Sequence, residues 1–257
     1  PAVRENATHN IKYFTQDQGM PGTVGHCLLQ DCYGRIWVGT DNGLVMMDGE
    51  NLYVYTTRQG LSNNIVNSLL EDAGGKVWIG TAGGGVNVYD PERNGFLAIN
   101  TSQGLSNNFV LSLLEDAGGR VWIGIYEGGV NVYDPERKGF LAYTTSQGLS
   151  HNVVSLLEDA GGRVWIGTWG GGVNVYDPER NGFLAYTTSQ GLSNNYVFSL
   201  LKDGAERVWI GTWGGGVNVY DPKRDGFLTF TTSQGLSSNY VRSFLEDAGG
   251  RVWIGTW

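Results

Sequence analysis

Few side chains in this 257-residue chain have the types and spacing needed for catalysis. The three histidines, His9, His26 and His151, are scattered, and their spacing assembles neither a metal triad nor a Ser-His-Asp set. His26 precedes Cys27, which is the pairing of a cysteine nucleophile, but a shared place in the first strand of the first repeat is the interpretation we favour. We therefore predict no enzyme, no cofactor and no metal site, with a lyase or hydrolase as the least supported function.

Aromatic side chains at one repeated position are stronger candidates. The string WIGT or a close variant occurs six times, and the residue after it changes between copies whose neighbours scarcely change. This position reads Asp41, Ala82, Tyr126, Trp169, Trp213 and Trp257 in successive copies. Aromatic rings can stack on sugars or other flat apolar faces, so its four aromatic residues are candidate ligand-binding residues. Packing at a channel rim or against the next repeat is the alternative.

Asparagines in the string GLSNN and its variants are a second candidate group. Five of them are candidate ligand-binding residues: Asn64, Asn108, Asn152, Asn195 and Asn239. Asn also hydrogen-bonds to nearby backbone and accepts unusual φ values, so a role in the turn is the alternative that the local composition favours. In either case the group is expected in a loop, because the string separates two strand-like runs.

These candidates recur because the chain is a tandem repeat. Tryptophans recur at intervals of 41 to 44 residues, and such a period indicates a repeat architecture. They are Trp37, Trp78, Trp122, Trp165, Trp209 and Trp253, and we expect them to fill the space between repeats. Each copy contains four short runs rich in β-branched and aromatic residues. In one copy the runs are Tyr196 to Leu201, Arg207 to Thr212, Val217 to Tyr220 and Phe227 to Thr232.

Turn residues between the runs predict hairpins, and hence one antiparallel sheet in each copy. Asp72 to Gly75 supplies residues that tolerate positive φ, and Asp90 to Gly95 places Pro early and Gly last in a turn. Four antiparallel strands in about 44 residues match a propeller blade. A parallel β-helix is the alternative fold, which the hairpins disfavour. We predict an all-β protein, a β-propeller of about six four-stranded antiparallel blades.

One propeller domain spans residues 1–257 in this interpretation. Its blades are approximately 20–60, 61–104, 105–148, 149–191, 192–235 and an incomplete sixth, 236–257. Residues Ile11 to Phe14 align with the fourth strand of other copies, so we expect segment 11–19 to complete the last blade and close the ring. The third strand of that blade is still missing. Three explanations are open: a chain that continues past Trp257, imperfect closure, or a gap filled by another chain.

Two kinds of loop should share one face of such a ring: those that join blades and those between the second and third strands of a blade. All the candidate aromatic and asparagine residues fall in these loops, and loop-built faces are common binding sites. A variable position early in the first strand either lines the channel or reflects drift; it reads Asn67, Leu111, Phe198 and Arg242. Acidic pairs such as Glu71-Asp72 belong to the opposite face, where we expect solvated turn carboxylates.

Composition disfavours two classes of partner. The formal net charge is −8 and no basic cluster offsets it, so nucleic acid is a poor partner. No apolar run reaches the roughly 18 to 20 residues that span a bilayer, so we expect no membrane insertion by this chain. Residues 1–10 hold no recognisable targeting signal. The two cysteines, Cys27 and Cys32, both lie in the first copy and do not form a disulfide framework.

The strings GLSNN, SLLED and WIGT, and a GGG run before a short strand ending in Tyr-Asp, resemble the two-component regulator propeller family. The resemblance covers the chain from Tyr13 onward. It implies a periplasmic or extracellular sensor region of a bacterial signalling protein, often joined to a membrane segment and to a histidine kinase or diguanylate cyclase. It also implies that some propellers of this kind recognise glycans.

Two functions from different classes follow. The first is a non-catalytic ligand-binding or sensor module that takes a small molecule or a glycan on the loop face. The second is a structural or protein-interaction scaffold of recently amplified repeats, since the internal copies are nearly identical. In that case another protein, or a second copy of the chain, would use the incomplete last blade for association.

Overall fold

The computed structural model describes residues 14–93, 95–137, 139–149, 152–224 and 226–257. Within these ranges, six antiparallel sheets follow one another along the chain, and five of them have four strands while the last has two. Strands within each sheet pair in sequence order, so each sheet is a meander of hairpins. The prediction of an all-β fold built from four-stranded antiparallel repeats is confirmed.

The strands of the first three sheets are β1 (Gly25–Gln30), β2 (Ile36–Thr40), β3 (Gly43–Asp48), β4 (Asn51–Tyr55), β5 (Val66–Glu71), β6 (Val77–Thr81), β7 (Val86–Asp90), β8 (Gly95–Ile99), β9 (Val110–Glu115), β10 (Val121–Ile125), β11 (Gly129–Asp134) and β12 (Gly139–Tyr143). Those of the last three are β13 (Val153–Glu158), β14 (Val164–Thr168), β15 (Val173–Asp177), β16 (Gly182–Tyr186), β17 (Val197–Lys202), β18 (Val208–Thr212), β19 (Val217–Asp221), β20 (Gly226–Phe230), β21 (Val241–Glu246) and β22 (Val252–Thr256). Short 3-10 helices precede the first strand of each sheet: η1 (Gln16–Gln18), η2 (Thr57–Gln59), η3 (Thr101–Gln103), η4 (Thr145–Gln147), η5 (Thr188–Gln190) and η6 (Thr232–Gln234).

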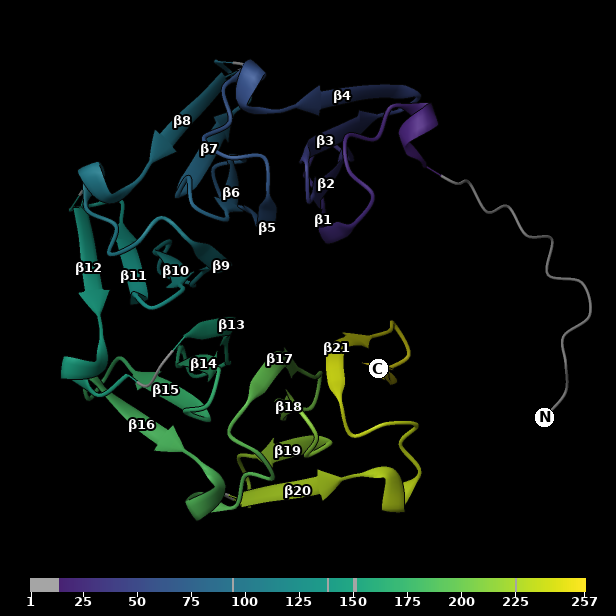
Figure 1. The fold of residues 1–257 in the computed structure, drawn as a ribbon. Coiled ribbons are helices and arrows are strands. Elements are labelled where there is room, and N and C mark those ends of the chain that lie inside the picture. Colours follow the sequence, from purple (N-terminus) through teal and green to yellow (C-terminus); the bar gives the residue numbers. More distant parts are fainter. Residues whose placement is uncertain (1–13, 94, 138, 150–151, 225) are drawn as a thin grey trace, which may run out of the picture.

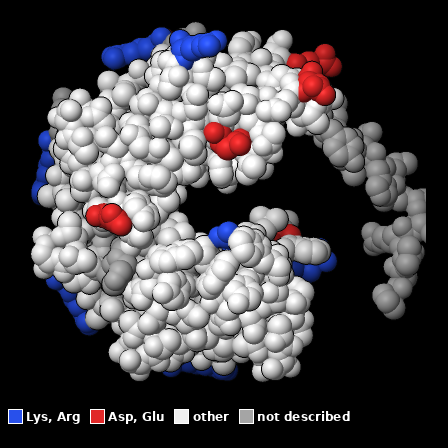
Figure 2. Space-filling view, viewed as in Figure 1, with Lys and Arg blue, Asp and Glu red and all other residues white. Residues whose placement is uncertain are grey.

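The sheets lie in chain order around a central space, as the blades of a propeller (Figure 1). The first strand of each sheet is innermost, and the first strands of consecutive sheets are in contact from β1 through β21. The first and last sheets are separated, and the central space is continuous with the gap between them (Figure 2). The predicted closing strand, Ile11 to Phe14, lies outside the described residues except for Phe14, which belongs to no strand.

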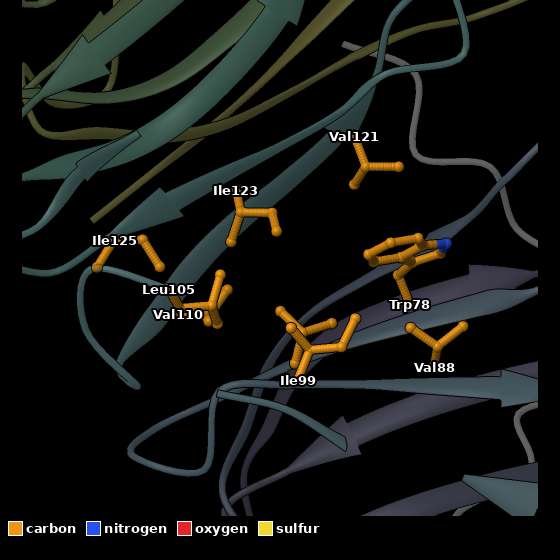
Figure 3. Close-up of a cluster of buried hydrophobic side chains, with 9 residues drawn as sticks. Trp78, Val88, Ile99, Leu105, Val110, Val121, Ile123 and Ile125 are labelled. Carbon is orange, nitrogen blue, oxygen red and sulfur yellow. The ribbon is translucent and has the colours of Figure 1, made fainter. Parts of the chain in front are cut away.

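Apolar side chains from two neighbouring blades close each seam between them. In the seam between the second and third sheets, Trp78 and Val88 lie against Val110, Val121 and Ile123 of the next sheet (Figure 3). All five are buried. Full burial of such a side chain stabilises the fold by roughly 1.5 to 3 kcal/mol. The core is therefore divided among the seams and does not form one central cluster.

The WIGT tryptophans occupy these seams wherever a next blade follows, as predicted. Trp37, Trp122 and Trp165 have no exposed surface. Trp253 carries the same motif in the last sheet and is 55% exposed. Among the described residues no further sheet packs on it, so the burial of this motif depends on the neighbouring blade.

The glycine of the WIGT motif allows neighbouring sheets to approach closely. A Cβ atom at Gly167 would lie 2.8 Å from Val197 Cγ1 of the next sheet, well inside the optimum separation of nonbonded carbons. The same contact recurs in every described seam, with the pairs Gly39–Val66, Gly80–Val110, Gly124–Val153, Gly167–Val197 and Gly211–Val241. A Cβ atom at Gly255 of the last sheet would meet only Ser243 of the same sheet.

In the third and fourth sheets the aspartates of the acidic pairs before the first hairpin turn are buried, so the expectation of solvated carboxylates was wrong there. Asp116 is only 4% exposed, and its Oδ2 accepts hydrogen bonds from Trp122 Nε1 and from Arg120 Nε, each at 2.7 Å. Glu115 reaches the preceding sheet, where its Oε2 accepts the backbone N–H of Ala73 at 2.8 Å. The aspartate accepts the hydrogen bond of a buried indole N–H, and the glutamate forms a hydrogen bond between two neighbouring blades. Both residues are therefore parts of the seam.

Candidate ligand-binding site

The loops that join blades and the loops after the WIGT motif meet on one face of the ring. Trp169, directly after the fourth copy of the motif, donates its backbone N–H to the carbonyl of Asn152 at 2.9 Å and pairs with Tyr196 of the next sheet in a β-bridge. Gly170 donates its backbone N–H to the carbonyl of Asn195 in the next joining loop at 3.1 Å. Loops from adjacent blades therefore form one continuous surface.

The five candidate asparagines are engaged in holding these loops. Asn64 Oδ1 accepts the backbone N–H of Thr57, the first residue of η2, at 2.8 Å. Three others make the same bond at 2.8 to 2.9 Å: Asn108, Asn195 and Asn239. Asn152 differs, because its Oδ1 accepts the backbone N–H of Glu127 in the preceding sheet at 2.6 Å. These bonds give each asparagine a role in the turn, and a ligand role for them stays a prediction.

The aromatic candidates lie on this same surface, which we call the aromatic face: Tyr126, Trp169, Trp213 and Trp257. The ring centroids of Trp169 and Trp213 are 6.4 Å apart, and those of Trp213 and Trp257 are 5.0 Å apart. Tyr126 packs on Phe109, with their ring centroids 5.4 Å apart. Trp169 is 43% exposed and Trp257 is 68% exposed, whereas Trp213 is half-buried. Large apolar surface is thus left open at Tyr126, Trp169 and Trp257, on the third, fourth and sixth blades.

A β-bulge in each first strand brings a further residue to the central space. In β13 the pairing skips from Val153 to Ser155, which leaves Val154 without a partner in β14. A bulge inserts one unpaired residue and redirects its side chain. The bulge residues of successive sheets are His26, Asn67, Leu111, Val154, Phe198 and Arg242. The variable position of the sequence is therefore the bulge position, and the one-residue deletion in the fourth copy concealed Val154.

Bulge residues and residues of the aromatic face together line one concave site of about 490 Å³. Its lining residues are Leu111, Tyr126, Asn152, Val154, Trp169, Phe198 and Arg242. They come from four consecutive sheets, the third to the sixth. Small-molecule sites are typically concave, of a few hundred Å³, and mostly apolar with a few polar groups. The sequence indicated this site only through variability at two positions of the repeat.

Arg242 lies at one wall of this concave site, where it contacts aromatic rings. Its guanidinium carbon is 4.5 Å from the ring centroid of Phe198 and 4.4 Å from that of Trp257. A cation over an aromatic face within about 6 Å is attracted by the ring quadrupole. The rings therefore hold the guanidinium in a defined orientation at the edge of the site.

The His26–Cys27 pair lacks the properties of an activated nucleophile. Burial raises the pKa of the Cys27 thiol to about 12, so the thiol is protonated at neutral pH. Cys27 Sγ contacts the carbonyl of Val66 at 3.9 Å in the seam to the second sheet, while His26 is exposed. His9 and His151 lie outside the described residues.

Five segments of the chain match the family model for the two component regulator propeller: residues 60–83, 104–127, 147–170, 191–214 and 235–257. Each segment runs from a joining loop through a first strand to the loop after the WIGT motif. The matched segments therefore contain all the residues that line the concave site. Comparison with curated proteins gave no match.

Several solved structures share the propeller fold. The extracellular domain of the putative hybrid two component system BT3049 from B. thetaiotaomicron has a TM-score of 0.66 at 21% identity, over 96% of this chain and 40% of that chain. PorZ of the Porphyromonas gingivalis type-IX secretion system has a TM-score of 0.70 at 18% identity, over 89% and 37%. A catalytically inactive virginiamycin B lyase from Staphylococcus aureus has a TM-score of 0.71 at 11% identity, over 93% and 79%. These likenesses establish the fold, and this chain spans at most 40% of the length of the first two proteins.

Proposed function

Since the chain carries five two component regulator propeller repeats, we propose that it is a non-catalytic sensor module that binds a ligand in the concave site of its aromatic face. The observation that carries this proposal is the convergence of exposed aromatic rings and bulge residues from four blades on one site. Trp169 and Trp257 leave much of their ring surface exposed, and contiguous exposed apolar surface of this kind marks interaction sites.

The ligand class follows from the side chains that line the site. The rings of Trp169 and Tyr126 can stack on the apolar faces of sugars or of other flat molecules, and the amide of Asn152 lies beside them. A glycan or a small molecule with a flat face fits this lining. Relatives of the same fold are extracellular domains, which supports a location outside the cytoplasm. Across the described ranges, no helix is long and apolar enough to cross a membrane.

The chemistry of the site supports binding without turnover. Its ionisable residues are Tyr126 and Arg242, neither paired with a general acid or base among its lining residues. The described part of the chain holds no group of three His, Cys, Asp or Glu side chains arranged to bind a metal. Turnover of any substrate that disappears in a His26→Ala variant would revive the enzyme hypothesis.

A glycan and metabolite screen tests the proposal. We expect saturable binding to the full chain that is lost in a Trp169→Ala, Trp213→Ala double variant, as measured by calorimetry. Tyr53→Ala is the matched control, because Tyr53 is an exposed aromatic residue on the outermost strand β4, away from the site. Equal binding by the double variant and the control would reject the proposed site.

A scaffold that associates with a second copy of the chain is the alternative function. It is favoured by the open ends of the ring, where Trp253 and Leu245 are exposed on the last sheet and Leu28 and Val24 are exposed on the first. These two apolar faces would meet head to tail between copies, as consecutive blades meet within one chain. The edge of β22 that pairs with no strand among the described residues offers further backbone groups for pairing.

Light scattering over a concentration series separates the two functions. Oligomers that grow with concentration, and that disappear in a Leu245→Glu variant, would support the scaffold. A steady monomer would reject it and leave the sensor. Tyr53→Glu provides the control for a new surface charge at a position outside both open ends.

A further inference from the structure

This inference rests on the proposed function and narrows its ligand. We infer that the concave site takes a ligand in which a carboxylate is joined to a flat apolar body. The carboxylate binds the guanidinium of Arg242, and the body lies against Trp169, Phe198 and Val154.

Arg242 differs from most other arginines of the protein in having no anionic partner. Nine arginines in the described ranges form ion pairs with aspartates. Arg242 and Arg58 form none there, although the chain carries an excess of acidic residues. Arg58 is exposed on η2, whereas Arg242 lines the concave site of the aromatic face. An unpaired cation at the wall of a site points to an anionic ligand.

The orientation of Arg242 suits a carboxylate. The guanidinium carbon lies 4.5 Å from the ring centroid of Phe198, 4.4 Å from that of Trp257 and 5.8 Å from that of Trp213. Rings this close attract the cation, and within the described residues the guanidinium makes no hydrogen bond, so its N–H edge is available to a ligand. That edge matches the two oxygens of a carboxylate, which it binds through two parallel hydrogen bonds. Holding the guanidinium in advance also lowers the entropic cost of binding.

The remaining walls are uncharged, so the rest of the ligand is apolar or neutral. Leu111, Val154, Phe198 and Trp169 supply apolar surface, and Asn152 and Tyr126 supply neutral polar groups. An acidic group of this face, Glu127, lines a neighbouring concavity together with Asn152. Two ligand sources share the required chemistry, an aryl carboxylate and a uronate of an acidic oligosaccharide.

Calorimetry on the full chain with two matched pairs of probes tests the inference. The pairs are 2-naphthoate with 2-naphthamide, and α-1,4-digalacturonate with α-1,4-galactobiose. We expect the acid of one pair to bind about tenfold more tightly than its neutral partner, the effect of one charge-assisted contact. The pair whose acid binds more tightly than its neutral partner identifies the ligand class, which is an aryl carboxylate or a uronate. Raised salt should reduce the preference, because the cation is exposed.

Variants separate a charge effect from a packing effect. Arg242→Gln should abolish the tighter binding of the acid. Arg242→Lys should retain only part of it, because an ammonium cannot form two parallel hydrogen bonds from one plane. Arg58→Gln should leave the difference in affinity unchanged. Equal affinity for acid and neutral probes, with both lost in Trp169→Ala, would overturn the inference and leave the proposed function intact. Failure of all four probes to bind, in a chain that still binds a ligand from the glycan and metabolite screen, would also overturn the inference and leave the proposed function intact.

Discussion

Trp165 and Trp169 lie four residues apart in one blade and belong to two different regions of the molecule. Trp165, at the seam, has no exposed surface and donates its Nε1 proton to Asp159 at 2.8 Å. Trp169, on the aromatic face, is 43% exposed, and its ring packs on those of Tyr196, Phe198 and Trp213. The seam residue is the same in every copy, and the face residue changes from copy to copy. The position whose side chain is buried between two blades holds the same residue in every copy. The position that lies open on the aromatic face holds different residues.

The last sheet provides an internal control for this comparison. Its Trp253 has the seam motif and the same hydrogen bond to an aspartate, Asp247 Oδ2 at 2.9 Å, yet more than half of the ring is exposed. The motif thus builds the local contacts by itself, whereas burial requires a following blade. Pairs of variants at a seam residue and at a counterpart that lacks this packing therefore test the comparison.

The largest effect should come from truncating the two tryptophans. Trp165→Ala is expected to lower the free energy of unfolding by about 4 kcal/mol, because it leaves a cavity in the seam and removes a partner of Asp159. Trp169→Ala should lower it by less than about 1 kcal/mol, since its ring is already half in water. Urea denaturation followed by circular dichroism measures both. Equal losses would show that the aromatic face is part of the core.

Removing the seam aspartate should have the next largest effect. Asp159→Ala leaves the Nε1 proton of Trp165 and the guanidinium of Arg163 without their partner, and is expected to cost about 3 kcal/mol. Asp247→Ala breaks the same bonds in the last sheet, where water replaces them, and should cost far less stability than Asp159→Ala. The two urea midpoints give the comparison. An equally large loss of stability in Asp247→Ala would mean that another surface packs on the last sheet in solution.

A single methyl group tests the close approach of the blades. Gly167→Ala is expected to cost about 2 kcal/mol, because the new Cβ collides with Val197 in a packed seam. Gly255→Ala should be nearly neutral, since its Cβ meets the Ser243 hydroxyl, which can rotate away. Thermal unfolding midpoints of the two variants provide the measurement. A neutral Gly167→Ala would show that the seam can widen without loss.

The smallest expected effect is a dependence of stability on pH. Burial by itself would raise the pKa of Asp203, but hydrogen bonds from Trp209 and from Arg207 outweigh it and the pKa is lowered. A folded-state pKa below the unfolded value of about 3.9 contributes stability that is present above that pH and is lost as the pH falls through the folded-state value. Asp203→Asn should remove this contribution. Urea midpoints between neutral and acidic pH should therefore fall more steeply in the parent chain, and equal slopes would contradict the assignment.

Strand positions were predictable because hairpin pairing depends on nearby residues. The predicted run Val217 to Tyr220 corresponds to β19 (Val217–Asp221), and Arg207 to Thr212 corresponds to β18 (Val208–Thr212). Turn glycines and β-branched residues act over a few positions, so the repeat reveals them directly. The contact of Glu115 with Ala73 could not be predicted, because it joins residues 42 positions apart in neighbouring blades.

The sequence by itself determined the blade: its period, its four strands and the loops that carry the candidate residues. These features arise from turn chemistry and pairing within about 44 residues. Only the tertiary structure decided that Val154, Phe198 and Arg242 share one site with Trp169. That outcome depends on a bulge in each first strand and on the packing of each blade against the next. Such packing is set by contacts between copies, which no single repeat contains.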